Sequence, residues 1–205
     1  MSNKRKRPAR SDRTQPAAKQ TAKKGSARPW LLAGGVVVVV GLLAAVVLSG
    51  VETGERPSGI PEGTQLVPVG DPVHIDGDID YGVLVPAGGP HNSVWLNCGY
   101  YGTPIRAENA VHSLEHASVW ITVRPDADSR TLDELRGLAG RRQKLIVSPV
   151  PGQGPLLMAT AWGHQLSLNS VDDPRLRQFV EEFENSFRYA PEPQAICFGG
   201  VGSPE

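Results

Sequence analysis

The chain has 205 residues with 21 basic and 21 acidic side chains, so its formal net charge is zero. The charge is unevenly distributed: residues 1–28 hold ten Lys or Arg and one acid, which leaves residues 29–205 with a net charge of −9. This acidity argues against a nucleic-acid partner for the main part of the chain. Besides Met1, only Met158 offers a thioether. The composition therefore excludes a Met-rich copper(I) carrier.

The basic residues 1–28 have almost nothing apolar to bury and are expected to be disordered. The uncharged residues 29–51 follow them, and an apolar run of roughly 20 residues is long enough for a helix that crosses a bilayer. Because Lys and Arg resist translocation, we expect a single-pass protein of the cell membrane with a cytoplasmic N-terminus. The C-terminal part would then be extracytoplasmic. A cleaved signal peptide is the alternative, because small residues, Ser49 and Gly50, follow the apolar run.

Residues 52–68 are rich in Gly, Pro and Glu, which is typical of a linker. Residues 69–205 are then long enough for one domain with its own core. Cys98 and Cys197 are the only cysteines, and in an oxidising compartment they are expected to form a disulfide. The alternative, one of them as a metal-ligating thiolate, requires reduced sulfur outside the cell.

Short segments broken by turn residues fill residues 71–103, which predicts irregular chain. Thr103 and Pro104 are typical of an N-cap and a first helical position, and they predict a helix over 105–116. The β-branched and aromatic residues 119–123 predict a strand. A capping box at 131–134 predicts a helix that ends near residue 139.

Further apolar runs of strand length occupy residues 145–147, 156–162 and 165–168. The last predicted element is an amphipathic helix that begins after Asp173 and Pro174, and its apolar residues recur at helical spacing: Leu176, Phe179, Val180, Phe183 and Phe187. The fold class that follows is α+β, a small mixed sheet with helices packed on one face, preceded by the transmembrane helix.

The sequence His112-Ser-Leu-Glu-His116 places two imidazoles four residues apart, on one face of the predicted helix. Such a pair can bind one cation, and Glu108 or Glu115 could act as a further ligand or orient an imidazole. His91 and His74, both in predicted loops, could complete the site.

The same five residues match H-x-x-E-H, the pattern of inverted zincins, in which the Glu is a general base. The alternative without a metal is that His112 and His116 are buried, hydrogen-bonded core histidines or exposed polar groups. His164 follows an apolar run and is expected to be structural. No phosphate-binding loop, nucleophile elbow or Ser-His-Asp set is recognisable.

Several blocks together resemble an uncharacterised bacterial envelope family, the domain of unknown function three-one-zero-five, which is common in actinobacteria. The resemblance covers about residues 70–202 and rests on these segments: 74–81, Gly-Pro-His at 89–91, Asn-Cys-Gly-Tyr at 97–100, 108–116, Ala-Trp-Gly at 161–163, Asp-Asp-Pro at 172–174, and Pro-Glu-Pro at 191–193 before Cys197. The chain departs from the family at Ala117, where Gly is usual, and at Val123, where an aromatic is common.

The resemblance implies a membrane-anchored or secreted extracytoplasmic domain and singles out His91, His112, Glu115 and His116, with His74. We therefore expect an accessory protein that binds zinc or copper(II), mainly through His112, His116 and His91. Its partners would be the lipid bilayer and other envelope proteins. The alternatives are a metal-dependent hydrolase with Glu115 as general base, and a metal-free structural or interaction domain.

Overall fold

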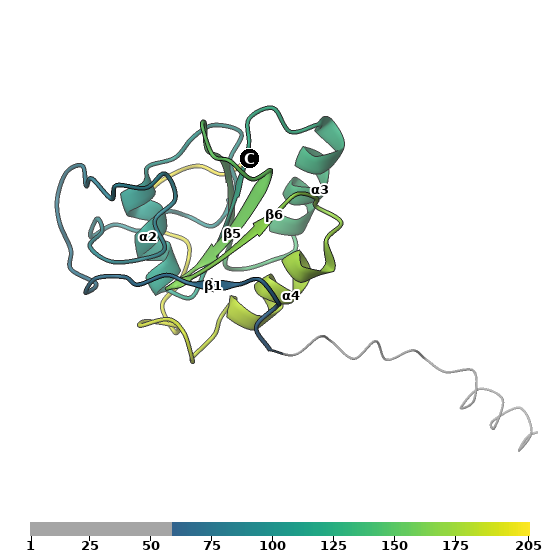
Figure 1. Ribbon diagram of the computed structural model, residues 1–205. Helices are drawn as coiled ribbons and strands as arrows, with labels where there is room; N and C mark the ends of the chain where they lie inside the picture. The colour runs from purple at the N-terminus through teal and green to yellow at the C-terminus, as the bar shows by residue number, and fades with distance from the viewer. Residues whose placement is uncertain (1–58) are drawn as a thin grey trace, which may run out of the picture. The chain divides into compact units, whose positions relative to one another are not determined.

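The computed structural model describes residues 59–205 (Figure 1). The predicted cytoplasmic tail, the predicted transmembrane helix at 29–51 and the first part of the predicted linker lie outside the described residues. None of the helices within residues 59–205 has the length and hydropathy that a membrane crossing requires.

A six-stranded mixed sheet forms the centre of the described part, with the order β1-β6-β5-β3-β4-β2. Strand β3 pairs with β4 in parallel and with β5 antiparallel, so both orientations meet at the middle of the sheet. The strands are β1 (Gln65–Leu66), β2 (Gly99–Tyr100), β3 (Val119–Val123), β4 (Leu145–Pro149), β5 (Leu157–Ala161) and β6 (His164–Leu168). The mixed α+β class is confirmed. Strand β1 pairs with β6, so the chain joins the sheet before the predicted end of the linker at residue 68.

The prediction that all helices cover one face of the sheet is wrong (Figure 1). Helices α3 (Ser129–Ala139) and α4 (Pro174–Phe183) share one core with Ile121 of β3, whereas α2 (Ala107–Glu115) shares a second core with the neighbouring Trp120. Successive side chains of a strand point to opposite faces, and all five residues of β3 are buried. A strand buried on both sides needs a covering layer on each face.

Two helix starts differ from prediction. Helix α2 begins later than expected, with Arg106 rather than Thr103 as its N-cap and no side chain capping it. Helix α3 is capped by Asp128, whose carboxylate accepts the backbone N–H of Thr131 at 2.7 Å. The predicted capping Thr131 therefore lies inside the first turn, because an acidic N-cap three residues earlier satisfies its N–H.

Helix α4 ends at Phe183, and Phe187 is 76 % exposed, so the prediction that Phe187 belongs to its apolar face is wrong. Glu184 leaves the helical conformation, and its carboxylate accepts the backbone N–H groups of Gln143 and Lys144. Asn185 follows with a positive φ of 60°, a conformation that Asn tolerates and that turns the chain away.

Cys98 and Cys197 form a disulfide, as predicted, with their Cα atoms 5.4 Å apart. It joins the C-terminal segment to the chain before β2, where Asn97 also donates to the carbonyl of Val201 at 2.8 Å. Residues 59–205 thus contain two hydrophobic cores, a disulfide and the six-stranded sheet.

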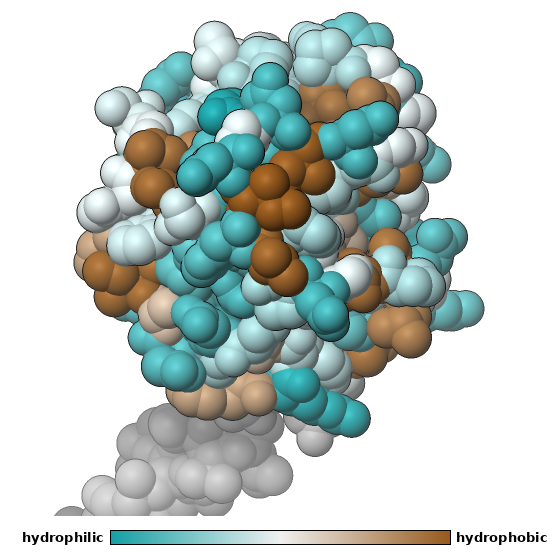
Figure 2. All heavy atoms as spheres, turned by 90° about the vertical axis from the view of Figure 1, so that its left-hand side faces the viewer, coloured by the Kyte–Doolittle hydropathy of each residue, from teal (hydrophilic) through white to brown (hydrophobic). Residues whose placement is uncertain are grey.

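Figure 2 shows the side of the molecule that carries α2 and the loops before it. Hydrophobic side chains appear there in separate groups among hydrophilic ones. The loops before α2 contribute exposed Val73, Ile75, Val83, Leu84 and Val94.

A candidate metal centre

Four of the predicted site residues come together beside α2. The potential ligand atoms of His74, His91, His112 and Glu115 all lie within 4.8 Å of one another. His112 and Glu115 are three residues apart on α2, so they share one helical face. His74 and His91 face each other in an isolated parallel bridge between two loop segments. The group therefore combines one helix with two loops that are distant from it in sequence.

Backbone hydrogen bonds hold the two loop histidines in register. The N–H of Ile75 donates to the carbonyl of His91 at 2.8 Å, and the N–H of His91 donates to the carbonyl of Val73 at 2.9 Å. The imidazole rings then lie close together, with centroids 5.0 Å apart for His74 and His91 and 4.8 Å apart for His91 and His112. His74 is exposed, so the cluster reaches the surface at this residue.

The tautomers of the two buried imidazoles follow from their partners. Nδ1 of His91 lies 2.8 Å from the carbonyl oxygen of Gly89, and Nδ1 of His112 lies 2.7 Å from that of Asn92. A carbonyl can only accept, so each Nδ1 carries the proton and each neutral ring presents a lone pair on Nε2. Burial lowers the pKa of both imidazoles, and neighbouring imidazoles lower it further, which favours the neutral, ligating form.

His91 is fully buried, and its Nε2 has no hydrogen-bond partner among residues 59–205. This nitrogen lies 3.0 Å from Oε2 of Glu115, outside hydrogen-bond geometry. An imidazole lone pair and a carboxylate oxygen are both acceptors and repel each other at this distance. A proton on either group, or a cation between the two groups, would relieve the repulsion.

One pair of these atoms is already spaced like two ligands of the same metal ion. Bonds of about 2.0–2.1 Å to tetrahedral zinc place neighbouring ligand atoms roughly 3.3 Å apart. The 3.0 Å between His91 and Glu115 is similar. The widest separation in the group, 4.8 Å, would have to close by roughly 1.5 Å for all four atoms to bind one such ion.

Glu115 is itself buried, and burial, followed by the nearby Glu192, raises the pKa of its carboxyl group. A buried carboxylate is costly unless it is paired with a cation or takes up a proton. The described residues give Glu115 no Lys or Arg partner within ion-pair distance. Its position is therefore suited to a bound cation.

Glu108, the other acid predicted to serve the site, has a different role. Its Oε1 accepts the backbone N–H of Ile79 at 3.0 Å, and its Oε2 lies 3.4 Å from Nε of Arg106. Tyr81 donates its hydroxyl to the carbonyl of Pro90 at 2.7 Å. These contacts attach the loop after His74 to α2 and to the segment before His91.

His116 does not belong to the four-residue group, although its spacing from His112 predicts a shared ion. It is the C-cap of α2, and its Nδ1 lies 2.8 Å from the carbonyl oxygen of Ile196. Its Nε2 lies 3.9 Å from Oε2 of Glu192. Because α2 ends at Glu115, the imidazole of His116 faces the C-terminal segment, while its ring still contacts that of His112 with centroids 4.6 Å apart.

A tight turn follows His116 although Ala117 stands where the family usually has Gly. Ala117 has a φ of 62°, and its N–H donates to the carbonyl of Leu114 at 3.0 Å. A left-handed residue of this kind is usually Gly, and Ala adopts the conformation at a modest cost.

The family model described as "Protein of unknown function (DUF3105)" matches residues 73–199. The chain belongs to this family. All members of the four-residue group lie inside the matched range, as do both cysteines. A search of curated proteins found no match, and a search of solved structures found none either.

His164, the remaining histidine, lies outside the group. It begins β6, and its Nδ1 lies 2.8 Å from the carbonyl oxygen of Trp162. Its ring packs against Phe183 and Tyr189, with centroids 4.7 and 5.1 Å away. This is the environment of a structural histidine.

Proposed function

We propose that this domain binds one transition-metal ion through His74, His91, His112 and Glu115. The observation that carries the proposal is the buried Nε2 of His91, which lacks a hydrogen-bond partner and faces a buried carboxylate at 3.0 Å. Buried polar atoms are nearly always satisfied, so an unsatisfied one inside a cluster of ligating groups supports a missing cation. The hydrogen bonds from Nδ1 to backbone carbonyls resemble those that orient imidazoles in metal sites.

Zinc or copper(II) fits this donor set best. Imidazole suits zinc, copper, iron and nickel, whereas sites for magnesium and calcium are built from oxygen atoms. Three neutral imidazoles and one carboxylate carry one negative charge, which leaves a divalent ion with a net charge of +1. Both cysteines are joined in the disulfide, so no thiolate is available as a ligand.

We further propose that the domain lies outside the cell, attached to the membrane by residues 29–51, in the bacterial envelope. The basic residues 1–28 and the uncharged run after them support this orientation. The Cys98–Cys197 disulfide also supports it, because such bonds persist in oxidising compartments. In this setting the metal centre would serve a binding or accessory role, with other envelope proteins as partners.

Metal analysis tests the proposal. The full-length chain, without a His tag and in a non-ionic detergent, is loaded with zinc or copper(II), dialysed and assayed by elemental mass spectrometry. We expect near-stoichiometric metal in the wild type and a loss in His91→Ala and His112→Ala. His164→Ala is the matched control, since it removes an imidazole outside the group, and it should keep the metal.

His116→Ala separates the ligand set proposed here from the one predicted by the i, i+4 spacing. Because His116 lies outside the four-residue group, this variant should retain most of the metal. A wild type that binds neither metal, or equal metal in the wild type, His91→Ala and His112→Ala, would refute the proposal and leave a disulfide-linked interaction domain.

A metal-dependent hydrolase is the second candidate, and the position of Glu115 favours it. If the three imidazoles alone hold the ion, the carboxylate lies next to the open position, and burial already raises its pKa towards that of a general base. Glu115→Gln distinguishes the two roles. A ligand role predicts loss of metal, whereas a base role predicts that metal is retained while hydrolysis of a test ester is lost.

A further inference from the structure

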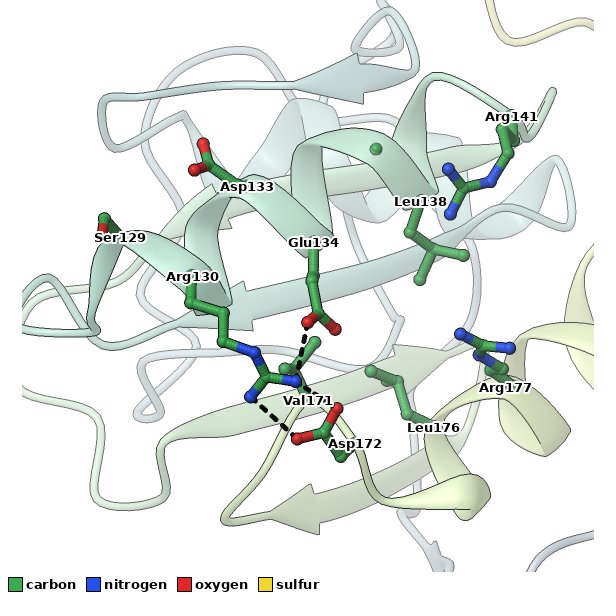
Figure 3. Close-up of a pocket in the computed structure, with 11 residues that line it drawn as sticks. Ser129, Arg130, Asp133, Glu134, Leu138, Arg141, Val171, Asp172, Leu176 and Arg177 are labelled. Atoms are coloured by element: carbon green, nitrogen blue, oxygen red, sulfur yellow. Dashed lines mark hydrogen bonds and ion pairs between the residues drawn. The ribbon is translucent and has the colours of Figure 1, made fainter.

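A groove on the other side of the sheet carries a second cluster of charged residues. It has a volume of about 750 Å³ and lies between α3 and the chain that leads into α4 (Figure 3). A cavity of this size is in the range of those that hold small organic ligands. None of the four metal-site residues lines it.

At one end of the groove the charges are paired. The guanidinium of Arg130 forms two hydrogen bonds with the carboxylate of Asp172, at 2.8 and 2.9 Å, and lies 2.9 Å from Glu134. This is the fork-to-fork geometry that a carboxylate adopts with a single guanidinium.

The other end of the groove carries two exposed guanidiniums. Arg141 follows the end of α3 and Arg177 belongs to α4, and both side chains line the groove between these elements (Figure 3). Within residues 59–205 neither Arg141 nor Arg177 forms an ion pair. The pKa of Asp172 is lowered mainly by its hydrogen bonds with Arg130, and the charge of Arg177 makes a smaller contribution. Leu138, which is half-buried, provides an apolar surface beside the two guanidiniums, whereas Leu176 belongs to the buried core beneath the groove.

Gly137 leaves room for this arrangement. A Cβ placed on Gly137 would lie 3.3 Å from one guanidinium nitrogen of Arg141, so the side chain of Arg141 lies over a position that has no side chain of its own. Glycine weakens a helix interior relative to alanine.

We infer that the Arg141–Arg177 end of the groove binds a phosphate monoester whose organic part contacts Leu138. One anion can bridge two guanidiniums from different elements if it offers more than two acceptor atoms. A phosphate monoester has three terminal oxygens and a charge of about −1.5 to −2 at neutral pH, which matches two guanidiniums. A carboxylate offers two coplanar oxygens and is satisfied by one guanidinium, as Asp172 is by Arg130.

Calorimetric titration of the full-length chain in a non-ionic detergent tests this inference. The probes are phenyl phosphate, inorganic phosphate and the short-chain lipid dihexanoyl phosphatidic acid. We expect saturable binding of phenyl phosphate, tighter than that of inorganic phosphate, and at least a tenfold loss of affinity in Arg141→Gln/Arg177→Gln. Tighter binding of the lipid would identify the source as a lipid headgroup, and tighter binding of phenyl phosphate would identify a soluble ester.

A matched control removes the same charge elsewhere. Arg124→Gln/Arg188→Gln neutralises two arginines outside the groove and should change the affinity less than twofold. Equal losses in the two double variants would show that binding is non-specific, and absence of binding in the wild type would also overturn the inference. The titration is repeated in His91→Ala, which should bind phenyl phosphate as the wild type does, because the groove is separate from the metal site.

Discussion

Acidification of the metal-free domain should destabilise it through the buried histidines. Burial lowers the pKa of His91, His112 and His116 below the ordinary value of 6.5. Above about pH 6.5 these groups are neutral in both the folded and the unfolded chain. As the pH falls below that value, the unfolded chain takes up protons that the folded chain resists. The stability is therefore fully present above the unfolded pKa and is lost as the pH falls through the folded pKa values.

The slope of the unfolding free energy against pH has an upper limit. Each group that is protonated only in the unfolded chain contributes about 1.4 kcal/mol per pH unit, so three give at most about 4 kcal/mol per pH unit. Glu115 acts in the opposite direction, because its pKa is raised and the folded chain keeps a proton that the unfolded chain has released. Glu115 therefore adds to the stability as the pH falls towards its ordinary pKa of 4.5, and this reduces the slope of stability against pH at the acid end of the range. A domain with a typical stability of about 5–15 kcal/mol would lose a large part of it within one or two pH units.

Urea unfolding of residues 54–205, freed of metal and followed by tryptophan fluorescence, measures this slope in half-unit steps from about pH 7.5 to about pH 5. The informative comparison is His112→Asn, which keeps an N–H donor for the Asn92 carbonyl but cannot be protonated. Its slope should be smaller than that of the wild type by up to about 1.4 kcal/mol per pH unit. Equal slopes in the two proteins, or a stability that does not fall on acidification, would refute the reasoning.

Three further predictions concern stability and are each measured by urea unfolding. Removing the disulfide in Cys98→Ala/Cys197→Ala opens a loop with a sequence separation of 99 and should cost up to about 4.7 kcal/mol by the chain-entropy estimate; a loss below about 1 kcal/mol would contradict it. Lys144→Met removes a buried ammonium that donates to two backbone carbonyls, at 2.7 and 2.8 Å, and should cost about 3 kcal/mol. Ser113→Ala should cost about 1–3 kcal/mol, because it leaves the buried carbonyl of Leu96 without its 2.7 Å hydroxyl donor; unchanged stability would show that another donor replaces it.

Local patterns predicted the elements well where the signal lay within a few residues. The β-branched run at 119–123 is β3, with the predicted bounds. The apolar spacing that begins at Leu176 is the buried face of α4. The same spacing failed at Phe187, because periodicity continues past the point where Glu184 and Asn185 leave the helix. At that point Glu184 accepts hydrogen bonds from the two backbone N–H groups just before β4, a long-range contact that no local pattern contains.

The placement of helices on both faces of the sheet was foreseeable in part. The run Val-Trp-Ile-Thr-Val has no alternation of polar and apolar residues, which is typical of a strand buried on both sides. The candidate metal site was also predictable only in part. The proximity of His112 and Glu115 follows from helical geometry, but the bridge between His74 and His91 is a backbone pairing of two irregular segments. Its partners could not be found from spacing, although both histidines were candidates.

The disulfide and the metal centre should be separable, because the C-terminal segment holds a different histidine from those that face the ion. The carbonyl of Ile196, next to Cys197, accepts from His116, whereas His91 and His112 are oriented by carbonyls of the segment 89–92. Opening the disulfide should therefore release the ring of His116 and leave the metal ligands in place.

The double variant Cys98→Ala/Cys197→Ala should consequently be less stable but, under conditions where it is folded, bind zinc with an affinity within about threefold of the wild type. Its NMR spectrum should show a changed environment for His116 and an unchanged one for His91. A folded variant that has lost the metal would show that the C-terminal segment, and not only the loops before α2, shapes the centre. In that case the backbone contact from the N–H of Glu192 to the carbonyl of Glu115, at 2.9 Å, would be the connection to test next.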